Sequence, residues 1–346
     1  MKYRFLAILF IFAFVPAGQA LAQKAAPDTQ KTIRLAKMLP DSDAVATVDI
    51  KRLFAEALPR ILTGNQATLS GINAHAEQIK TRTGIDLKNF DQIAVGVSFK
   101  KVSGKEMDLE PVVLAQGKYT PEGLLSAVKL ASKGDYREEK TGGKTIYIFS
   151  GKAAEGAVPA AGNSMIGRMI DRAIKGILSR EIAVGAFTAD TVVFGPVERV
   201  RQAIEGKNHP GPAVLNLPGL QHGGIASFGA KLPAGLSALL GYENDELAKN
   251  IDSIRYLSGW MDLGDGSTIV RITGKTTQAA EAADFLETIQ ELQGVGKLIF
   301  SRAKDPNQQV YARLIENAKF SRAGNEITLD LQIAHADIGI LIGEKK

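Results

Sequence analysis

The sequence predicts an α+β fold made of two similar lobes, each a mostly antiparallel sheet covered by helices. A unit of strand, turn, strand and helix occurs from Phe90 to Ala131 and again from Ile254 to Leu292. In both copies the second strand leaves through a Gly-Lys-x-Thr sequence. The expected elements around this unit also recur in the same order, which indicates an internal duplication. Because short turns join the strands, the sheets are expected to be antiparallel.

The first 22 residues have the pattern of a signal peptide. Lys2 and Arg4 precede an apolar run at 5–15, and the small residues Ala20 and Ala22 fit a cleavage site. The run is shorter than the ~20 apolar residues that span a membrane. The chain has no cysteine, so neither a lipid-bearing cysteine nor a disulfide is expected. We therefore expect a periplasmic or extracellular protein, cleaved near Ala22. An uncleaved N-terminal anchor is the alternative.

Length and charge restrict the remaining possibilities. A chain of 346 residues exceeds a usual single domain, which favours two lobes. The net charge is +5, and it falls to +3 when Lys2 and Arg4 leave with the signal peptide. A charge this small and well mixed gives no case for nucleic-acid binding. Aromatic residues make up 6% of the chain, so the cores are expected to be aliphatic.

The chain is expected to divide at its compositional breaks. Residues 23–37 are a mostly polar tether, 38–206 the first lobe, and 225–346 the second. The segment 207–224 is crowded with proline and glycine, which is typical of a linker.

The elements of the first lobe follow from hydrophobic spacing. In the strand at 44–50, Ala46 and Val48 would share one face. Thr120 and Thr277 end the two Gly-Lys-x-Thr sequences, and their hydroxyls are expected to cap the following helices. Besides the strand and the repeated unit, we expect helices at 51–62 and 66–82, a hairpin at 136–150, a helix at 165–180, strands at 182–187 and 191–195, and a helix at 196–205.

The second lobe is expected to repeat this order. Its elements are a strand at 225–231, a helix at 234–240, the second copy of the unit, a helix at 306–317, strands at 318–322 and 326–333, and a helix at 335–342. The helix at 66–82 and the hairpin at 136–150 have no counterpart there and are expected to be insertions. A coincidence between two ordinary α+β lobes is the alternative.

No motif of known chemistry passes its structural test. The tripeptides at 143–145 and 274–276 lack the earlier glycine of a phosphate-binding loop. Gly294-x-Gly296 lacks the third glycine of a dinucleotide loop. Ser98-x-x-Lys101 ends a strand, where residues three apart face opposite sides. We therefore predict no catalytic residue and no cofactor.

The histidines give no metal site. None has the spacing of a zinc motif, and they are scattered as His75, His209, His222 and His335. His209 and His222 flank the proposed linker and could approach one another, but solvated linker histidines are the preferred interpretation.

One helix carries the only predicted interaction surface. The helix at 165–180 has an unbroken apolar stripe and, outside it, the basic residues Arg168, Arg172, Lys175 and Arg180. Such a helix could lie on an anionic membrane surface. Packing of the stripe on its own sheet, with a solvated basic face, is the favoured alternative.

The start of the mature chain resembles a known family. Leu39-Pro40-Asp41-Ser42-Asp43-Ala44-Val45 is followed by Val48-Asp49-Ile50-Lys51-Arg52-Leu53-Phe54, and a similar segment follows from Gly84 to Val97. These residues are similar to an LPxxDAVxxVDxxxLF start in uncharacterised exported bacterial proteins of the acidobacterial type. The resemblance covers the first third to half of the chain. It implies export and transfers no catalytic or binding residue.

Three functions remain open. The first is an exported non-enzymatic protein, binding or structural in the cell envelope, because nucleophile, metal and cofactor motifs are missing. The second is a periplasmic carrier of an apolar ligand, which suits a protein with few aromatic and many small aliphatic residues. The third is a hydrolase whose site is assembled from distant residues. The expected partners are an envelope protein or an apolar ligand.

The signal peptide gives the first prediction. Mass analysis of the protein recovered from the cell envelope should find Gln23 at the N-terminus, because cleavage is expected after Ala22. A protein that still begins at Met1 would contradict cleavage and favour an anchored form.

Overall fold

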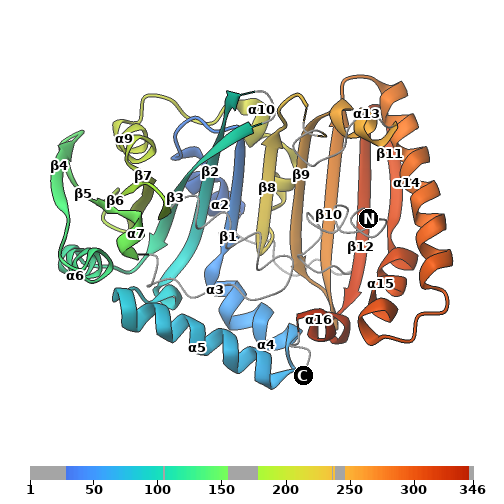
Figure 1. The fold of residues 1–346 in the computed structure, drawn as a ribbon, viewed down its shortest axis with the longest axis horizontal. Coiled ribbons are helices and arrows are strands. Elements are labelled where there is room, and N and C mark those ends of the chain that lie inside the picture. Colours follow the sequence, from blue (N-terminus) through green and yellow to red (C-terminus); the bar gives the residue numbers. More distant parts are fainter. Residues whose placement is uncertain (1–28, 104–105, 155–177, 236, 238–245, 343–346) are drawn as a thin grey trace.

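The computed structural model describes residues 29–103, 106–154, 178–235, 237 and 246–342. In this part of the chain the strands form one sheet of 12 strands, and every pair of neighbours is antiparallel (Figure 1). The order across the sheet is β11-β12-β10-β9-β8-β1-β2-β3-β7-β6-β5-β4. The α+β class and the antiparallel pairing are therefore confirmed. The strands of the two halves join in a single sheet, through the pairing of β1 with β8.

The strands lie close to the residues expected from sequence. Their bounds are β1 Ala44–Asp49, β2 Phe90–Ser103, β3 Glu106–Gly117, β4 Arg137–Thr141, β5 Lys144–Ser150, β6 Glu181–Ala186, β7 Thr191–Pro196, β8 Ala226–Lys231, β9 Ile254–Leu263, β10 Ser267–Thr276, β11 Lys319–Ala323 and β12 Glu326–Ala334.

The described helices are α2 Thr29–Lys37, α3 Ile50–Arg52, α4 Leu58–Ile61, α5 Gln66–Thr83, α6 Pro121–Ser132, α7 Gly151–Ala154, α9 Val197–Glu205, α10 Pro212–Leu215, α11 Pro218–His222, α13 Glu246–Ser253, α14 Ala279–Phe300, α15 Pro306–Asn317 and α16 His335–Ile342. The expected helices that fall on described residues are present, whereas α2, α7, α10, α11 and α13 are additional, and the helices expected at 165–180 and 234–240 lie largely outside the described residues. A π-helical turn, Leu53–Ala57, joins α3 to α4, so the helix expected at 51–62 is one continuous stretch.

Helices cover opposite faces of the sheet in its two halves. We call one face of the sheet the Val45 face. Over β1–β7 it is covered by α2, α9 and α10, and a first cluster there includes Val45, Leu114 and Val200. We call the other face the Val95 face. Over β8–β12 it is covered by α4, α15 and α16, and a second cluster there includes Leu257, Val270 and Leu314. A third, smaller cluster lies on the Val95 face under α6 and contains Val128, Phe149 and Ile182.

The two predicted threonine caps have different outcomes. The Thr120 hydroxyl accepts a hydrogen bond from the Gly123 amide at 3.0 Å and caps α6, as predicted. Thr277 does not cap α14. That helix is capped by Gln278, which forms a capping box with Glu281. A capping box satisfies two first-turn amides, so it replaces the threonine cap.

Part of the expected tether belongs to the packed structure. Residues 29–37 form α2, whose Leu35 and Ala36 are buried in the cluster on the Val45 face. The sequence of this segment is mostly polar, but its few apolar residues lie on one side of the helix. The last turns before Met38 are therefore ordered against β1 and β2 rather than forming a free tether.

The proline- and glycine-rich segment at 207–224 is also packed on the sheet. Its helices α10 and α11 bury Leu215 and Leu220 against the Val45 face. A Cβ added at Gly219 would lie 2.3 Å from the backbone nitrogen of Gly259, so α11 sits directly on β9 because this residue has no side chain. The segment connects the halves while remaining part of the core.

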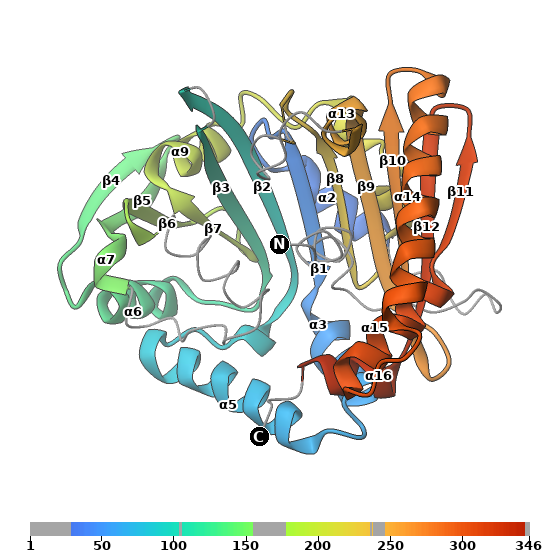
Figure 2. The same ribbon diagram turned by 45° about the vertical axis from the view of Figure 1, so that its right-hand side comes forward.

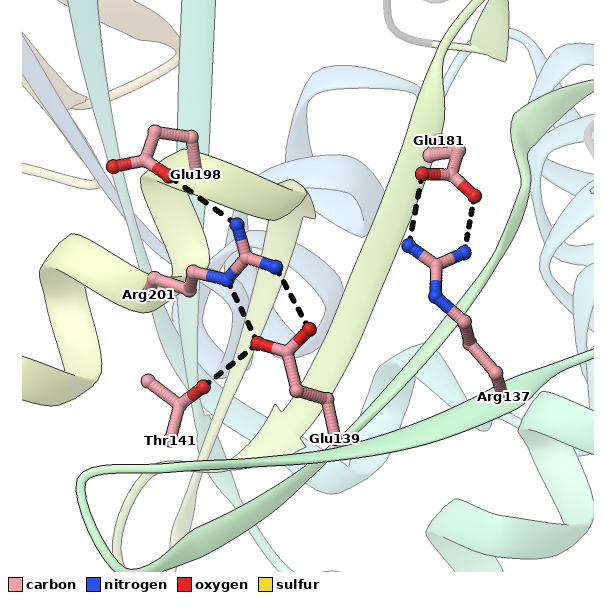
Figure 3. Close-up of polar contacts among 6 residues, drawn as sticks. All are labelled: Arg137, Glu139, Thr141, Glu181, Glu198 and Arg201. Carbon is pink, nitrogen blue, oxygen red and sulfur yellow. Dashed lines mark hydrogen bonds and ion pairs between the residues drawn. The ribbon is translucent and has the colours of Figure 1, made fainter.

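Ion pairs hold the edge of the sheet at β4 (Figure 3). Arg137 on β4 forms a two-pronged pair with Glu181 on β6, reaching across β5. Arg201 on α9 donates to both carboxylate oxygens of Glu139 on β4, at 2.8 and 2.7 Å. The hydrogen bonds from Arg201 hold the pKa of the Glu139 carboxyl at about 2, well below its ordinary 4.5. The hairpin β4–β5 is therefore tied to α9 by an ion pair whose carboxylate, Glu139, stays charged in mild acid.

The edge pair predicts a pH dependence. Because the pKa of Glu139 is lowered in the folded protein, its contribution to stability is complete above pH 4.5 and is lost as the pH falls toward about 2. Hydrogen exchange should show the β4 amides losing protection across this window. Glu139→Gln should lower their protection already at pH 4.5. Glu138→Gln on the same strand is the control, and an equal effect from it would contradict the assignment.

Candidate functional site

The centre of the sheet carries an apolar surface that none of the three clusters contains. On the Val95 face, every second side chain of β1, β2 and β3 lies in the area between the second and the third cluster. We call them the apolar strip, and they are Ala46, Val48, Ile93, Val95, Val97, Phe99, Leu109, Pro111 and Val113. Each keeps some exposure to solvent, and Leu109 is 54% exposed.

Cross-strand register makes the strip continuous. Ala46 pairs with Val95, and Val95 pairs in turn with Val113, so three neighbouring strands place aliphatic side chains side by side. Directly opposed residues in antiparallel strands have Cβ atoms about 4.5–5.5 Å apart. The surface is therefore a band of apolar side chains without a polar side chain between them.

The clusters on either side define the borders of the strip. Phe228 on β8 lies opposite Ala46 and packs on the second cluster, and Phe194 on β7 lies opposite Val113 and packs on the third. Helix α5 lies across the end of the sheet where β2 begins (Figure 2). The strip is thus the part of the Val95 face between two helix-covered areas.

A second open part of the same sheet has the opposite chemistry. On the Val45 face, β10 and β12 present Arg271 paired with Asp330 at 2.7 Å, and Lys275 paired with Glu326 at 3.0 Å. Polar side chains are the usual choice where one face of an antiparallel sheet meets water. The strip departs from this pattern, because a partly exposed surface of the same sheet is entirely apolar. This difference marks it as the candidate binding face.

The interaction surface predicted from sequence is not assembled in the described chain. Arg168, Arg172 and Lys175 lie outside the described residues. Arg180 is described, and its guanidinium pairs with Asp108 and Glu110 on β3. The hydrogen bond to Asp108 raises the pKa of Arg180, so its charge is stabilised by the protein's own carboxylates. It is therefore not available as the free cation that the sequence suggested.

The histidines do not meet. The His209 ring contacts the Leu39 carbonyl oxygen through Nδ1 at 3.1 Å, while His222 stacks on Trp260 with ring centroids 3.5 Å apart. The stacking removes one face of the imidazole from water and lowers the pKa of His222. Trp260 lies on the Val45 face beneath this ring. The described residues contain no group of three metal-ligating side chains.

Among the described residues one cation is buried, and its hydrogen-bond partners are structural. Arg199 on α9 is 3% exposed, and its guanidinium donates to Ser42 Oγ at 2.9 Å and to Gln202 Oε1 at 2.8 Å. Ser42 in turn donates to the Pro40 carbonyl at 2.8 Å. These bonds fix α9 to the turn before β1.

The strip was missed from sequence although a signal for it exists. Residues 93–99 read Ile-Ala-Val-Gly-Val-Ser-Phe, which places large apolar residues at every second position and small ones between. That alternation identifies an apolar face, but sequence spacing does not say whether helices cover it. Only the packing of α2 and α9 on the opposite face distinguishes the two surfaces.

Comparisons with known proteins assign no family. No protein-family model and no curated protein matches the chain. Crystal forms I, III and IV of TP0453 are similar in structure, at 10–11% identity and TM-scores of 0.43–0.45. They cover 89–92% of this chain and 96–99% of theirs. A likeness this weak carries no argument about function. Within the described residues, no helix has the length and apolar character needed to cross a membrane.

Proposed function

We propose that the protein is exported and acts by binding, as a carrier that holds an apolar chain, such as a lipid acyl group, on the apolar strip. The observation that carries this proposal is the contrast between the two open parts of the sheet. The part between β10 and β12 is polar, whereas the strip on β1–β3 is wholly apolar. An exposed apolar surface is a mark of an interaction site.

The strip suits a hydrocarbon chain in chemistry and length. Its side chains have no hydrogen-bonding groups, and the backbone of β2 is paired on both sides, so burial alone would supply the affinity. Each methylene removed from water contributes about 0.8 kcal/mol. From Ile93 to Phe99 the strand rises about 20 Å. One acyl chain spans about 15 Å, half of a bilayer's hydrocarbon core.

Two other roles compete with this proposal. The apolar stripe expected at 165–180 could cover the strip, and the protein would then be a structural or protein-binding element of the envelope. A hydrolase stays an alternative, but no arrangement of described residues favours it. The experiment below separates an apolar ligand from packing by the chain itself.

We also propose that the fold arose by internal duplication. Outward from the central β1–β8 pair, the first half continues through β2, β3, β7 and β6, and the second through β9, β10, β12 and β11. This matching order supports the proposal, with β4 and β5 as an insertion at one edge. In the second half, α15 and α16 cover the Val95 face over the corresponding strands. The strip, which no described helix covers, would then be a specialisation of the first half.

Extraction with organic solvent tests the carrier. Mass spectrometry of the extract from purified protein should detect a lipid. Val95→Thr combined with Val113→Thr should weaken lipid binding about tenfold or more, because two hydroxyls must lose water when the chain is buried. These residues face each other across β2 and β3. Thr273→Val, on the polar part of the sheet, is the control and should leave binding unchanged.

The opposite result is equally clear. A protein that contains and binds no lipid, and whose double variant melts at a lower temperature than the control variant, would show that the chain itself covers the strip. The carrier proposal would then be wrong.

A further inference from the structure

The end of α14 exposes more apolar surface than any other described helix. Val295 is 52%, Leu298 78% and Ile299 50% exposed. Residues three and four apart share one side of a helix, so the three aliphatic side chains form a single patch. The patch lies at the corner of the molecule where α14 ends beside α15 (Figure 1).

The orientation of this patch is fixed by contacts on the opposite side of the helix. Gln293 donates through Nε2 to the carbonyl oxygens of Ile315 and Ala318, at 2.6 and 2.8 Å. Phe300 packs against Tyr311 with ring centroids 6.1 Å apart. These contacts hold α14 to the end of α15 and direct Val295, Leu298 and Ile299 outward.

Exposed cations lie near the patch in the sequence, two of them just beyond the end of the helix. Lys297, Arg302 and Lys304 are exposed, and none of them forms an ion pair with a described residue. The sequence from Leu292 to Lys304 contains no acidic residue. Glu291 lies one turn earlier, so the basic and apolar character belongs to the last turns of the helix and the turn that follows.

We propose that the end of α14 docks the protein on an anionic membrane surface, with Val295, Leu298 and Ile299 entering the headgroup region and Arg302 and Lys304 pairing with lipid phosphates. Aliphatic side chains next to lysine and arginine are the composition of interfacial membrane contacts. A second copy of the chain is a poorer occupant, because a two-fold interface through this patch would bring the same cations together. The proposal stands on α14 and does not depend on the carrier function.

A local probe tests the docking. The chain has no cysteine, so Leu298→Cys allows an environment-sensitive fluorophore to be attached at the patch alone. Its emission should shift to the blue with vesicles of equal parts phosphatidylcholine and phosphatidylglycerol. Phosphatidylcholine alone should have little effect. Because the signal comes from position 298, membrane affinity of the N-terminal segment does not produce it.

Leu130→Cys provides a matched control. Leu130 is 53% exposed and is flanked by Lys129 and Lys133, but no second exposed aliphatic residue adjoins it in α6. A probe there should not change. Replacing Arg302 and Lys304 together with glutamine should weaken the vesicle affinity seen by the 298 probe by about 30-fold.

Three results would each overturn the proposal. The first is an unchanged probe at 298 on the anionic vesicles. The second is a shift that is unaffected by the loss of Arg302 and Lys304. The third is a shift without vesicles that grows with protein concentration, which would assign the patch to self-association.

Discussion

The antiparallel pairing of β1 with β8 is the contact on which the rest of the structure depends. Residues 44–48 pair with residues 226–230 and make one sheet from two halves of the chain. The Lys231 amide donates to the Asp43 carbonyl at 2.7 Å, and the Asp49 amide donates to the Ile225 carbonyl at 2.8 Å, so the ladder is closed at both ends. Arg52 and Asp262 add an ion pair at 2.6 Å between the halves. Because the β1–β8 pair lies in the middle of the sheet, neither half has a free strand edge there, and both faces of the sheet continue from one half to the other.

Local patterns allowed most elements to be predicted, since strands and helices follow from spacing within a few residues. The hairpin β4–β5, the cap at Thr120 and the helices α15 and α16 all follow from such patterns. The β1–β8 pairing could not be predicted, because nothing near Val45 identifies a partner beyond residue 200. The burial of Leu35 was missed for a similar reason: its packing partners lie far away in the sequence.

The apolar strip shows the same limit at the level of function. Alternation along β2 predicts that Val95 and Val97 share a face, but burial depends on which helices reach that face. Helices α2 and α9 cover the Val45 face over the strands of the first half, while α4, α15 and α16 cover the Val95 face over the strands of the second. The open surfaces therefore fall on opposite sides, and their chemistry can be compared only when the packing is known.

The contrast between the apolar strip and the polar part of β10 and β12 argues against a purely structural origin of the strip. Threonine has nearly the same shape as valine and a comparable preference for strands. The sheet itself uses polar residues such as Thr273 and Thr328 where β10 and β12 lie open. Residues of this kind at Val95 and Val113 would have kept the strand pairing while removing apolar area from water contact. Burying such area is favourable by roughly 25 cal/mol per Å², so leaving it partly exposed gives up stabilisation unless something covers it. An apolar strip in a sheet that elsewhere follows the polar rule is therefore best explained by an apolar partner.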